Sequence, residues 1–214
     1  RSTQSRSSAA SDVYKRQKYI NPSSQDIAVK TEARVIGIDD SPFVKRKDKK
    51  VLIVGVVYRG GVFPDGVVST YATVDGTDAT EKIASMINKC RFRTQLQAIM
   101  LKGVAVGGFN VIDIYKLHKL TRRPVVVVVR DYPDLEEIYR VLKWLKKKKA
   151  MALIRKLPKP AKVGRVYVQF AGTDLKTVRE LLKITSTRAF IPEPLRVAHL
   201  IAAGVVKGQS RGRA

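Results

Sequence analysis

The chain has 214 residues, 44% of them hydrophobic, which suits one domain with a core of its own. Its 42 Lys and Arg against 18 Asp and Glu give a formal charge of +24, so we expect a polyanionic partner: nucleic acid, with an anionic membrane surface as the alternative. No apolar run reaches the ~20 residues that cross a bilayer, and the lone cysteine, Cys90, excludes an intrachain disulfide and a cysteine-rich zinc site. Composition therefore predicts a soluble protein of the cytoplasm.

The two ends of the chain differ from its middle. Residues 1–17 are rich in Ser, Arg and Gln without hydrophobic periodicity, so we predict disorder there and interpret the segment, which resembles translated sequencing-adapter sequence, as a non-native leader. Residues 18–31 are expected to form an N-terminal extension and residues 207–214 a basic flexible tail. The folded part is then a single domain over residues 32–206.

Three strands come first in the predicted domain. Apolar runs predict strands over residues 34–39, 51–59 and 66–74, with a lysine-rich turn before the second and a Gly/Pro-rich turn before the third. Because these connections are short, consecutive strands are expected to pair antiparallel, as a meander.

Helices and strands alternate in the rest of the domain. A helix is expected from Asp75 or Thr77 to about Asn88, where Asp78 and Glu81 have capping-box spacing. The remaining predicted elements are a strand over 98–106, a short helix over 110–120, a strand over 124–130, a helix over 134–149, a strand over 165–170 and helices over 173–184 and 194–206. Five consecutive valines at 125–129 are typical of a strand that is buried on both faces.

This order of elements predicts an α/β fold of the ribonuclease H-like type. That arrangement is a mixed sheet in which a three-strand antiparallel meander precedes alternating helices and strands, with the first strand near the centre. A doubly wound sheet is the alternative, but it needs a crossover helix between the first two strands, and only about ten residues separate them.

Acidic residues follow two of the predicted strands. Asp39 and Asp40 end the first strand, and Asp75 and Asp78 follow the third. Carboxylates at strand ends are typical of sites that hold a divalent metal against phosphate, and a buried Asp on a central strand costs several kcal/mol unless a cation or hydrogen-bond donors satisfy it. The alternative is structural: turn formation for the first pair and helix capping for the second.

Basic residues form candidate phosphate contacts. The predicted nucleic-acid-binding residues are Lys45, Arg46 and Lys47 in the first turn, Gly107, Gly108 and Asn110 before the short helix, and Lys146, Lys147, Lys148 and Lys149. The lysines favour phosphate binding without base specificity, and the glycine pair favours a phosphate cradle on free backbone amides. The alternatives are solvated helix ends and an ordinary strand-to-helix turn.

Five side chains are reserve candidates, and the first is Asp40, beside Asp39. Asp113 is a reserve metal ligand, one turn into the predicted short helix. Glu193 and Arg196 are spaced for a local ion pair or for positioning a phosphate. His199 is expected to pack on the apolar face of the last helix, with catalysis as the second interpretation.

Five segments, in this order, resemble the motifs of a known family. They are GIDDSPF (37–43), VGVVYRGG (54–61), VDGTDAT (74–80), QAIMLKGVAVGGFNVIDI (97–114) and IPEPLRVAHLIA (191–202). They are similar to those of the mainly archaeal domain of unknown function family ninety-nine, also called the endonuclease dU family, a distant relative of endonuclease V. The resemblance extends from about residue 32 to the last residue.

The resemblance implies a ribonuclease H-like fold, Mg²⁺ and nicking of nucleic acid near a deaminated base. Carried over by motif, the metal-binding Asp of the first strand falls on Asp39, and the acidic residue after the third strand falls on Asp75. The Asp-Gly of the fourth strand falls on Lys102 and Gly103, which is a departure. A protonated lysine cannot coordinate Mg²⁺, but it can neutralise a phosphate oxygen.

Residues and resemblance together predict a Mg²⁺-dependent endonuclease that acts on DNA with deaminated bases, in repair. Asp39 and Asp75 would hold the ion with their carboxyl groups within ~6 Å of each other, and Lys102 would act as an electrostatic clamp on the phosphate. The first alternative is a nucleic-acid-binding protein on a degenerate nuclease fold. The second is a scaffold domain that docks to another protein.

Overall fold

The computed structural model describes residues 31–210. The predicted leader, the extension up to residue 30 and the tail beyond residue 210 lie outside the described residues. Among the described helices, none combines the length and the apolar character that a membrane span requires.

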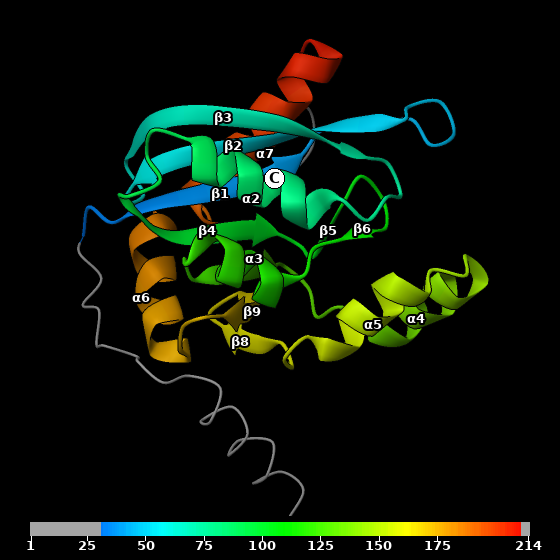
Figure 1. Cartoon of the computed structure of the whole chain (residues 1–214). Helices are drawn as coiled ribbons and strands as arrows, with labels where there is room; N and C mark the ends of the chain where they lie inside the picture. The colour runs from blue at the N-terminus through cyan, green and yellow to red at the C-terminus, as the bar shows by residue number, and fades with distance from the viewer. Residues whose placement is uncertain (1–30, 211–214) are drawn as a thin grey trace, which may run out of the picture.

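A seven-stranded mixed sheet forms the centre, in the order β3-β2-β1-β4-β7-β9-β8 (Figure 1). Its strands are β1 (Arg34–Asp40), β2 (Lys50–Arg59), β3 (Phe63–Thr73), β4 (Leu96–Lys102), β7 (Val125–Val129), β8 (Ala161–Val163) and β9 (Val166–Ala171). β1, β2 and β3 pair antiparallel, whereas β1, β4 and β7 run parallel to one another. The predicted meander and the near-central first strand are therefore confirmed. Strand β8 was not among the predicted strands.

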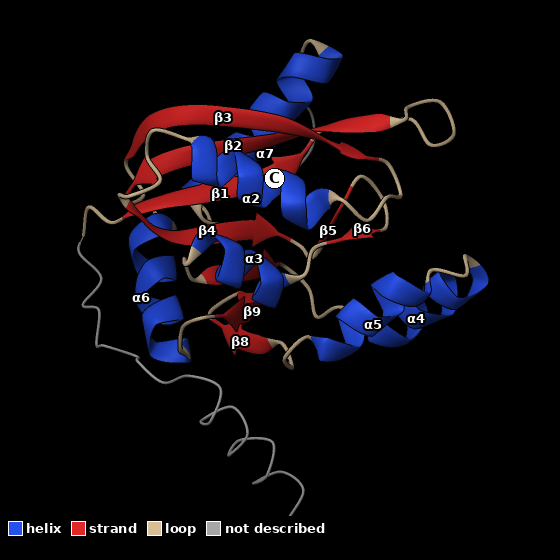
Figure 2. Ribbon diagram, in the orientation of Figure 1, coloured by secondary structure: helices blue, strands red, loops and turns tan. Residues whose placement is uncertain are grey.

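Helices cover both faces of the sheet (Figure 2). They are α2 (Ala79–Lys89), α3 (Ile114–Thr121), α4 (Leu135–Trp144), α5 (Lys148–Lys156), α6 (Leu175–Thr185) and α7 (Glu193–Lys207). α2 and α3 pack on one face with Ile36 and Ile38 of β1, and α6 and α7 pack on the other with Val35. Gly37 lets α7 approach closely, because a Cβ there would lie 2.3 Å from the carbonyl carbon of Pro194.

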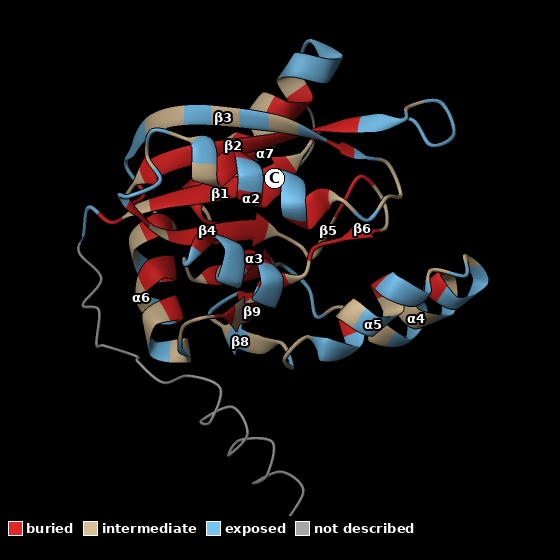
Figure 3. Ribbon diagram, in the orientation of Figure 1, coloured by how far each residue is buried: buried red, intermediate tan, exposed pale blue. Residues whose placement is uncertain are grey.

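The valine run behaves as its composition predicts. Val125 and Val127 face the core under α2 and α3, while Val126 and Val128 face the core under α6 and α7. β7 lies between β4 and β9, so both of its faces are covered. Figure 3 shows the central strands mostly buried and α4 and α5 largely exposed or half-buried.

The helix predicted over 110–120 begins four residues later in the structure. Asn110–Val111 (β6) instead pairs antiparallel with Ala105–Val106 (β5), and Gly107 and Gly108 form the turn between them. Helix α3 starts at Ile114, after Asp113, whose carboxylate accepts the backbone N–H of Lys116 at 2.9 Å. The predicted single strand over 98–106 accordingly ends at Lys102 and resumes as β5.

Two other predicted helices also differ from those in the structure. The expected helix over 134–149 is broken: α4 ends at Trp144 and α5 starts at Lys148, with Lys146 in the left-handed region at φ 53°. This break folds the two helices together over a small core of Leu142, Ala150, Ile154 and Val111. Helix α2 begins at Ala79 with Asp78 at the N-cap position, later than predicted, and the Asp78 side chain makes no capping hydrogen bond.

Candidate functional site

Three side chains meet where β1 and β4 end, those of Asp39, Lys102 and His199. Asp39 is 5% exposed, and its Oδ2 lies 2.9 Å from His199 Nδ1 and 3.2 Å from Lys102 Nζ. Lys102 Nζ is also 3.0 Å from His199 Nδ1. Asp39 Oδ1 accepts the backbone N–H of Asp40 at 3.0 Å. We call Asp39, Lys102 and His199 the Asp39 cluster.

The cluster combines residues from two strands and one helix. Asp39 faces α7 because side chains alternate along β1, and α7 lies close enough to present His199. The expectation that His199 packs on an apolar face is corrected: its ring nitrogen contacts a carboxylate. The Lys102 ammonium supplies the cation that a buried carboxylate requires.

Asp40 and Asp75 both hold the turn between β5 and β6. Asp40 Oδ2 accepts the N–H of Gly107 at 2.7 Å, and Asp75 Oδ1 accepts the N–H of Phe109 at 2.9 Å. The backbone N–H of Asp75 donates to Gly107 O at 2.7 Å. The predicted phosphate cradle therefore needs revision, because the Gly107 and Phe109 amides already donate to carboxylates. At Gly108, with φ 87°, a Cβ would lie 2.7 Å from Asp75 Oδ1, so the turn requires glycine.

The charge of Asp40 is sensitive to pH near neutrality. Burial raises its pKa from 3.8 to about 6, and the neighbouring charge of Asp39 acts in the same direction. The hydrogen bond from Gly107 and the charge of Lys102 oppose this rise. The pKa is thus set mainly by removal of the carboxylate from water.

Asn110 has a structural role in place of the predicted phosphate contact. Its side chain is fully buried, and its Nδ2 donates to Thr73 O at 2.9 Å and to Asp78 Oδ1 at 2.7 Å. Its Oδ1 accepts the N–H of Ala79 at 3.1 Å. Asp78 also accepts the N–H and hydroxyl of Thr73. Asn110 and Asp78 therefore fix the end of β3 to the start of α2.

The two lysine tracts converge on Phe109. A cavity of about 300 Å³ is lined by Lys146, Lys147, Lys148, Lys149, Phe109, Gly76, Thr77 and Ala150. Lys45, from the loop between β1 and β2, places Nζ 5.8 Å from the centre of the Phe109 ring. We call Lys45, Phe109 and Lys146–Lys149 the basic cleft. Arg46 and Lys47 are exposed on the same loop. Figure 1 shows that loop and the α4–α5 pair at the same end of the molecule, with β5 and β6 between them in this view.

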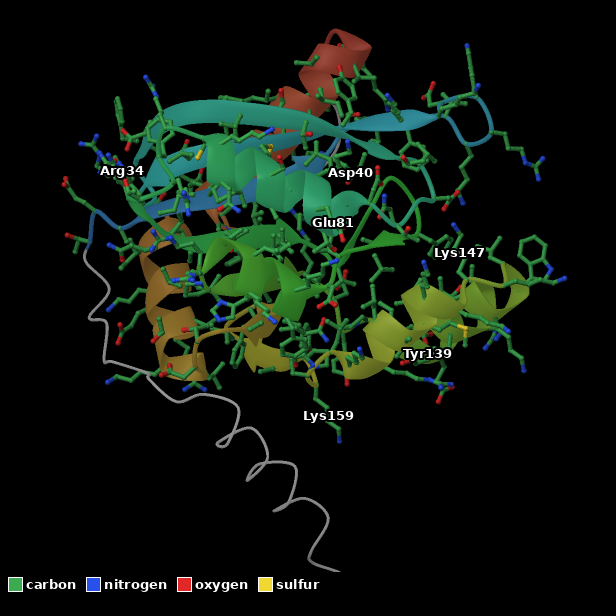
Figure 4. The ribbon with its side chains drawn as sticks, viewed as in Figure 1. Arg34, Asp40, Glu81, Tyr139, Lys147 and Lys159 are labelled. Atoms are coloured by element: carbon green, nitrogen blue, oxygen red, sulfur yellow. The ribbon has the colours of Figure 1, made fainter. Side chains whose placement is uncertain are left out.

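Lys147 connects the basic cleft to Asp75. Its ammonium donates to the backbone carbonyl of Asp75 and lies 3.8 Å from Asp75 Oδ1. Lys146, Lys148 and Lys149 are exposed. Figure 4 shows Lys147 at the junction of α4 and α5, on the side of the molecule where Asp40 also lies.

The reserve candidates have local partners. Glu193 is buried and pairs with Arg196 at 2.6 Å, as the spacing predicts, while Glu193 Oε1 has no hydrogen-bond partner among the described residues. Asp113 caps α3 and lines a second cavity of about 440 Å³. Glu81 and Lys116 form an ion pair at that cavity, and this pair lowers the pKa of Glu81.

The arrangement of donors does not fit a resident Mg²⁺ ion. Within residues 31–210, no three His, Cys, Asp or Glu side chains gather into a metal-binding group. Each of the two predicted ligands instead has a lysine beside it, Lys102 at Asp39 and Lys147 at Asp75. A hard cation such as Mg²⁺ needs oxygen ligands that are free to turn toward it.

Comparison with known proteins identifies the family. Residues 31–206 match the model of the family described as endonuclease dU. The chain belongs to the endonuclease dU family. A UPF0215 protein of Methanothermobacter thermautotrophicus is 46% identical over 191 residues, which cover 87% of this chain and 94% of that protein. The predicted resemblance is thus confirmed.

Solved structures agree with this endonuclease dU assignment. A protein of unknown function from Archaeoglobus fulgidus superposes with a TM-score of 0.75 at 36% identity, covering 81% of this chain and 97% of that one. Endonuclease V of Ciona intestinalis, solved with a 24mer DNA containing an inosine followed by a ribo-adenosine, gives a TM-score of 0.60 at 15% identity, covering 93% and 98%. The latter likeness confirms the ribonuclease H-like fold.

Sequence reasoning missed two parts of the site in this endonuclease dU protein. The sequence did not predict a functional role for Phe109, because an apolar residue next to a glycine pair is also typical of an ordinary turn. The contact between His199 and Asp39 joins residues 160 positions apart, and a single sequence carries no information on such a pair.

Proposed function

We propose that this protein binds the phosphate backbone of nucleic acid in the basic cleft and cleaves it at the Asp39 cluster, in DNA that carries a deaminated base. The proposal rests on one observation: the carboxyl ends of β1 and β4 carry Asp39 and Lys102 beside His199, and Asp40, next in the chain, contacts the turn that leads into the basic cleft. The family description, and the inosine-containing DNA bound by the Ciona endonuclease V, support the choice of substrate class.

Binding in the cleft would depend mainly on charge. Lys45, Lys146, Lys148 and Lys149 are exposed around Phe109, so their ammonium groups are available to phosphate oxygens. Contacts of this kind release counterions from nucleic acid, carry no base specificity and weaken steeply as salt is added.

Each member of the Asp39 cluster has a distinct part in the proposed reaction. An ammonium has three N–H donors, so Lys102 can bond Asp39 and still donate to a phosphate oxygen whose charge grows in the transition state. Asp39 orients the His199 ring through Nδ1, which leaves Nε2 free for proton transfer. As a water molecule attacks the phosphorus and the bond to the leaving oxygen breaks, Nε2 would either take the proton of that water or give a proton to the leaving oxygen.

Mg²⁺ is the cofactor that the resemblance implies, with Asp39 and Asp75 as its ligands. A bound ion would supply an activated water and neutralise phosphate charge. Because a lysine lies beside each of these two carboxylates, the proposed roles of Lys102, Asp39 and His199 do not require the ion. Calorimetric titration of Mg²⁺, with and without an oligonucleotide, tests whether nucleic acid creates a site for the ion.

The pairing of Lys102 with Asp39 favours one other function, binding without cleavage on a degenerate nuclease fold. In that case Lys102 has replaced the third acidic metal ligand of the nuclease, and the protein retains only the basic surface that binds nucleic acid.

A nicking assay separates the two functions. Duplexes with one uracil or one hypoxanthine, and the undamaged duplex, are incubated with the protein in Mg²⁺ or in EDTA, and binding is measured in parallel. The proposed function requires damage-dependent nicking that Asp39→Asn abolishes while affinity stays within about threefold, since the phosphate contacts lie elsewhere. Binding of every duplex without any nicking would leave the second function in place.

A further inference from the structure

Trp144, the single tryptophan of the chain, is directed to solvent. It is the last residue of α4, and 79% of its surface is exposed. The buried side of α4 is provided by Leu142, with Leu135 and Ile138 packed beside it, so Trp144 contributes little to the small core under this helix. Tryptophan is enriched at binding interfaces relative to the rest of a protein surface.

Basic residues are close to this tryptophan in the chain. Arg140 lies one helical turn before it on the same face of α4, and Lys143 and Lys146 flank it in the chain; all three are exposed. Lysines alone are explained by the dipole at a helix C-terminus, but an exposed indole does not complement a dipole. The combination of an aromatic plane with cations is how proteins hold unpaired bases: the ring stacks on the base and the cations contact the backbone.

The position of Trp144 relates it to the basic cleft. Lys147, three residues later, contacts Asp75. Three residues span at most about 10 Å, which is about three base steps of 3.4 Å. A strand whose backbone lies in the basic cleft therefore brings a nearby base within reach of Trp144.

We propose that Trp144 is a stacking platform for an unpaired base, so that the protein prefers nucleic acid with a single-stranded or unstacked region next to the segment held in the basic cleft. This proposal rests on the proposed function, because it needs nucleic acid in that cleft. It goes beyond the proposed function in naming the secondary structure of the substrate and a residue outside the Asp39 cluster that selects it.

Tryptophan emission tests the proposal directly, since Trp144 is the only source of that signal. A 20-nucleotide single strand and a blunt duplex of the same sequence are titrated into the full chain. We expect the emission to be quenched on saturation with the single strand and to change little with the duplex. Emission unaltered at saturating single strand overturns the proposal. So does emission that varies with protein concentration without oligonucleotide, because a second copy of the chain would then cover Trp144.

Variants supply a second readout that needs no catalysis. With a fluorescein-labelled strand, Trp144→Ala should weaken single-strand affinity about tenfold and leave duplex affinity within twofold, while Trp144→Phe should retain most of the single-strand affinity. Phe63→Ala, at an exposed aromatic on the other end of the sheet, is the matched control and should change neither. Equal single-strand affinity for Trp144→Ala and wild type overturns the stacking role alone. Loss of binding to both nucleic acids by the wild type would instead overturn the proposed function.

Discussion

Lys102 Nζ lies 3.2 Å from Asp39 Oδ2, across two adjacent parallel strands. The register pairs Ile38 with Leu101, so the next residues on β1 and β4 come side by side. Two carboxylates at this place would repel each other and attract a mobile cation. Here the cation is a lysine that is part of the chain, so the site is neutralised before any ligand arrives.

Lys102→Asp should therefore create metal affinity. The variant places a second carboxylate beside Asp39, and we expect at least a tenfold rise in Mg²⁺ affinity by calorimetry. Lys102→Met, which removes the ammonium without adding an oxygen ligand, is the control. If the two variants bind Mg²⁺ equally, residue 102 does not lie where an ion would bind.

Removing charge from the basic cleft should flatten the salt dependence of binding. Each lost phosphate contact reduces the slope of log affinity against log salt by about 0.9, so Lys146, Lys148 and Lys149→Gln together should reduce it by about 2 to 3. Lys147 is kept because it contacts Asp75. The matched control removes three exposed charges from α6, by Lys176, Arg179 and Lys183→Gln. An equal change of slope in both variants would mean that net charge, and not the cleft, attracts the nucleic acid.

Asp40→Asn should stabilise the protein above pH 6. Because the folded-state pKa is raised from 3.8 to about 6, the stabilising contribution of protonated Asp40 is complete below pH 3.8 and is lost as pH rises through 6. Asparagine avoids that loss and still accepts the N–H of Gly107. The unfolding free energy of the variant relative to wild type should grow between about pH 4 and 6, then stay constant at about 3 kcal/mol. Urea denaturation at several pH values measures it; a difference independent of pH contradicts the assignment.

Gly37→Ala should disturb the Asp39 cluster through α7. The added Cβ would lie 2.3 Å from the carbonyl carbon of Pro194 and 2.5 Å from Leu195 N, so the helix must move away from β1. We expect a loss of about 2 to 4 kcal/mol in unfolding free energy and a displaced His199. Gly204→Ala, on the same helix with open space around it, should be neutral or slightly stabilising. Thermal unfolding of both variants compares them.

The central strands could be predicted because each is a continuous apolar run between turn residues. The burial of residues 125–129 on both faces could be predicted because all five are valine. The α4–α5 break could not, since residues 134–149 have helical periodicity throughout. The break lets Leu142, Ala150 and Ile154 pack with Val111, which is far away in sequence. Asp39 and Lys102 were identified by motif, whereas His199 was misjudged because its helix neighbours are apolar and its partner lies on another element.

The small core under α4 and α5 has a thermodynamic consequence for the whole molecule. Leu142, Ala150 and Ile154 bury far less apolar surface than either face of the sheet, so this helical pair should open at a free energy below that of global unfolding. Its amides should then exchange with deuterium before those of β1 and β4. The helical pair and the turn that carry Lys146–Lys149 should thus rearrange around a ligand more readily than the strands that hold Asp39 and Lys102.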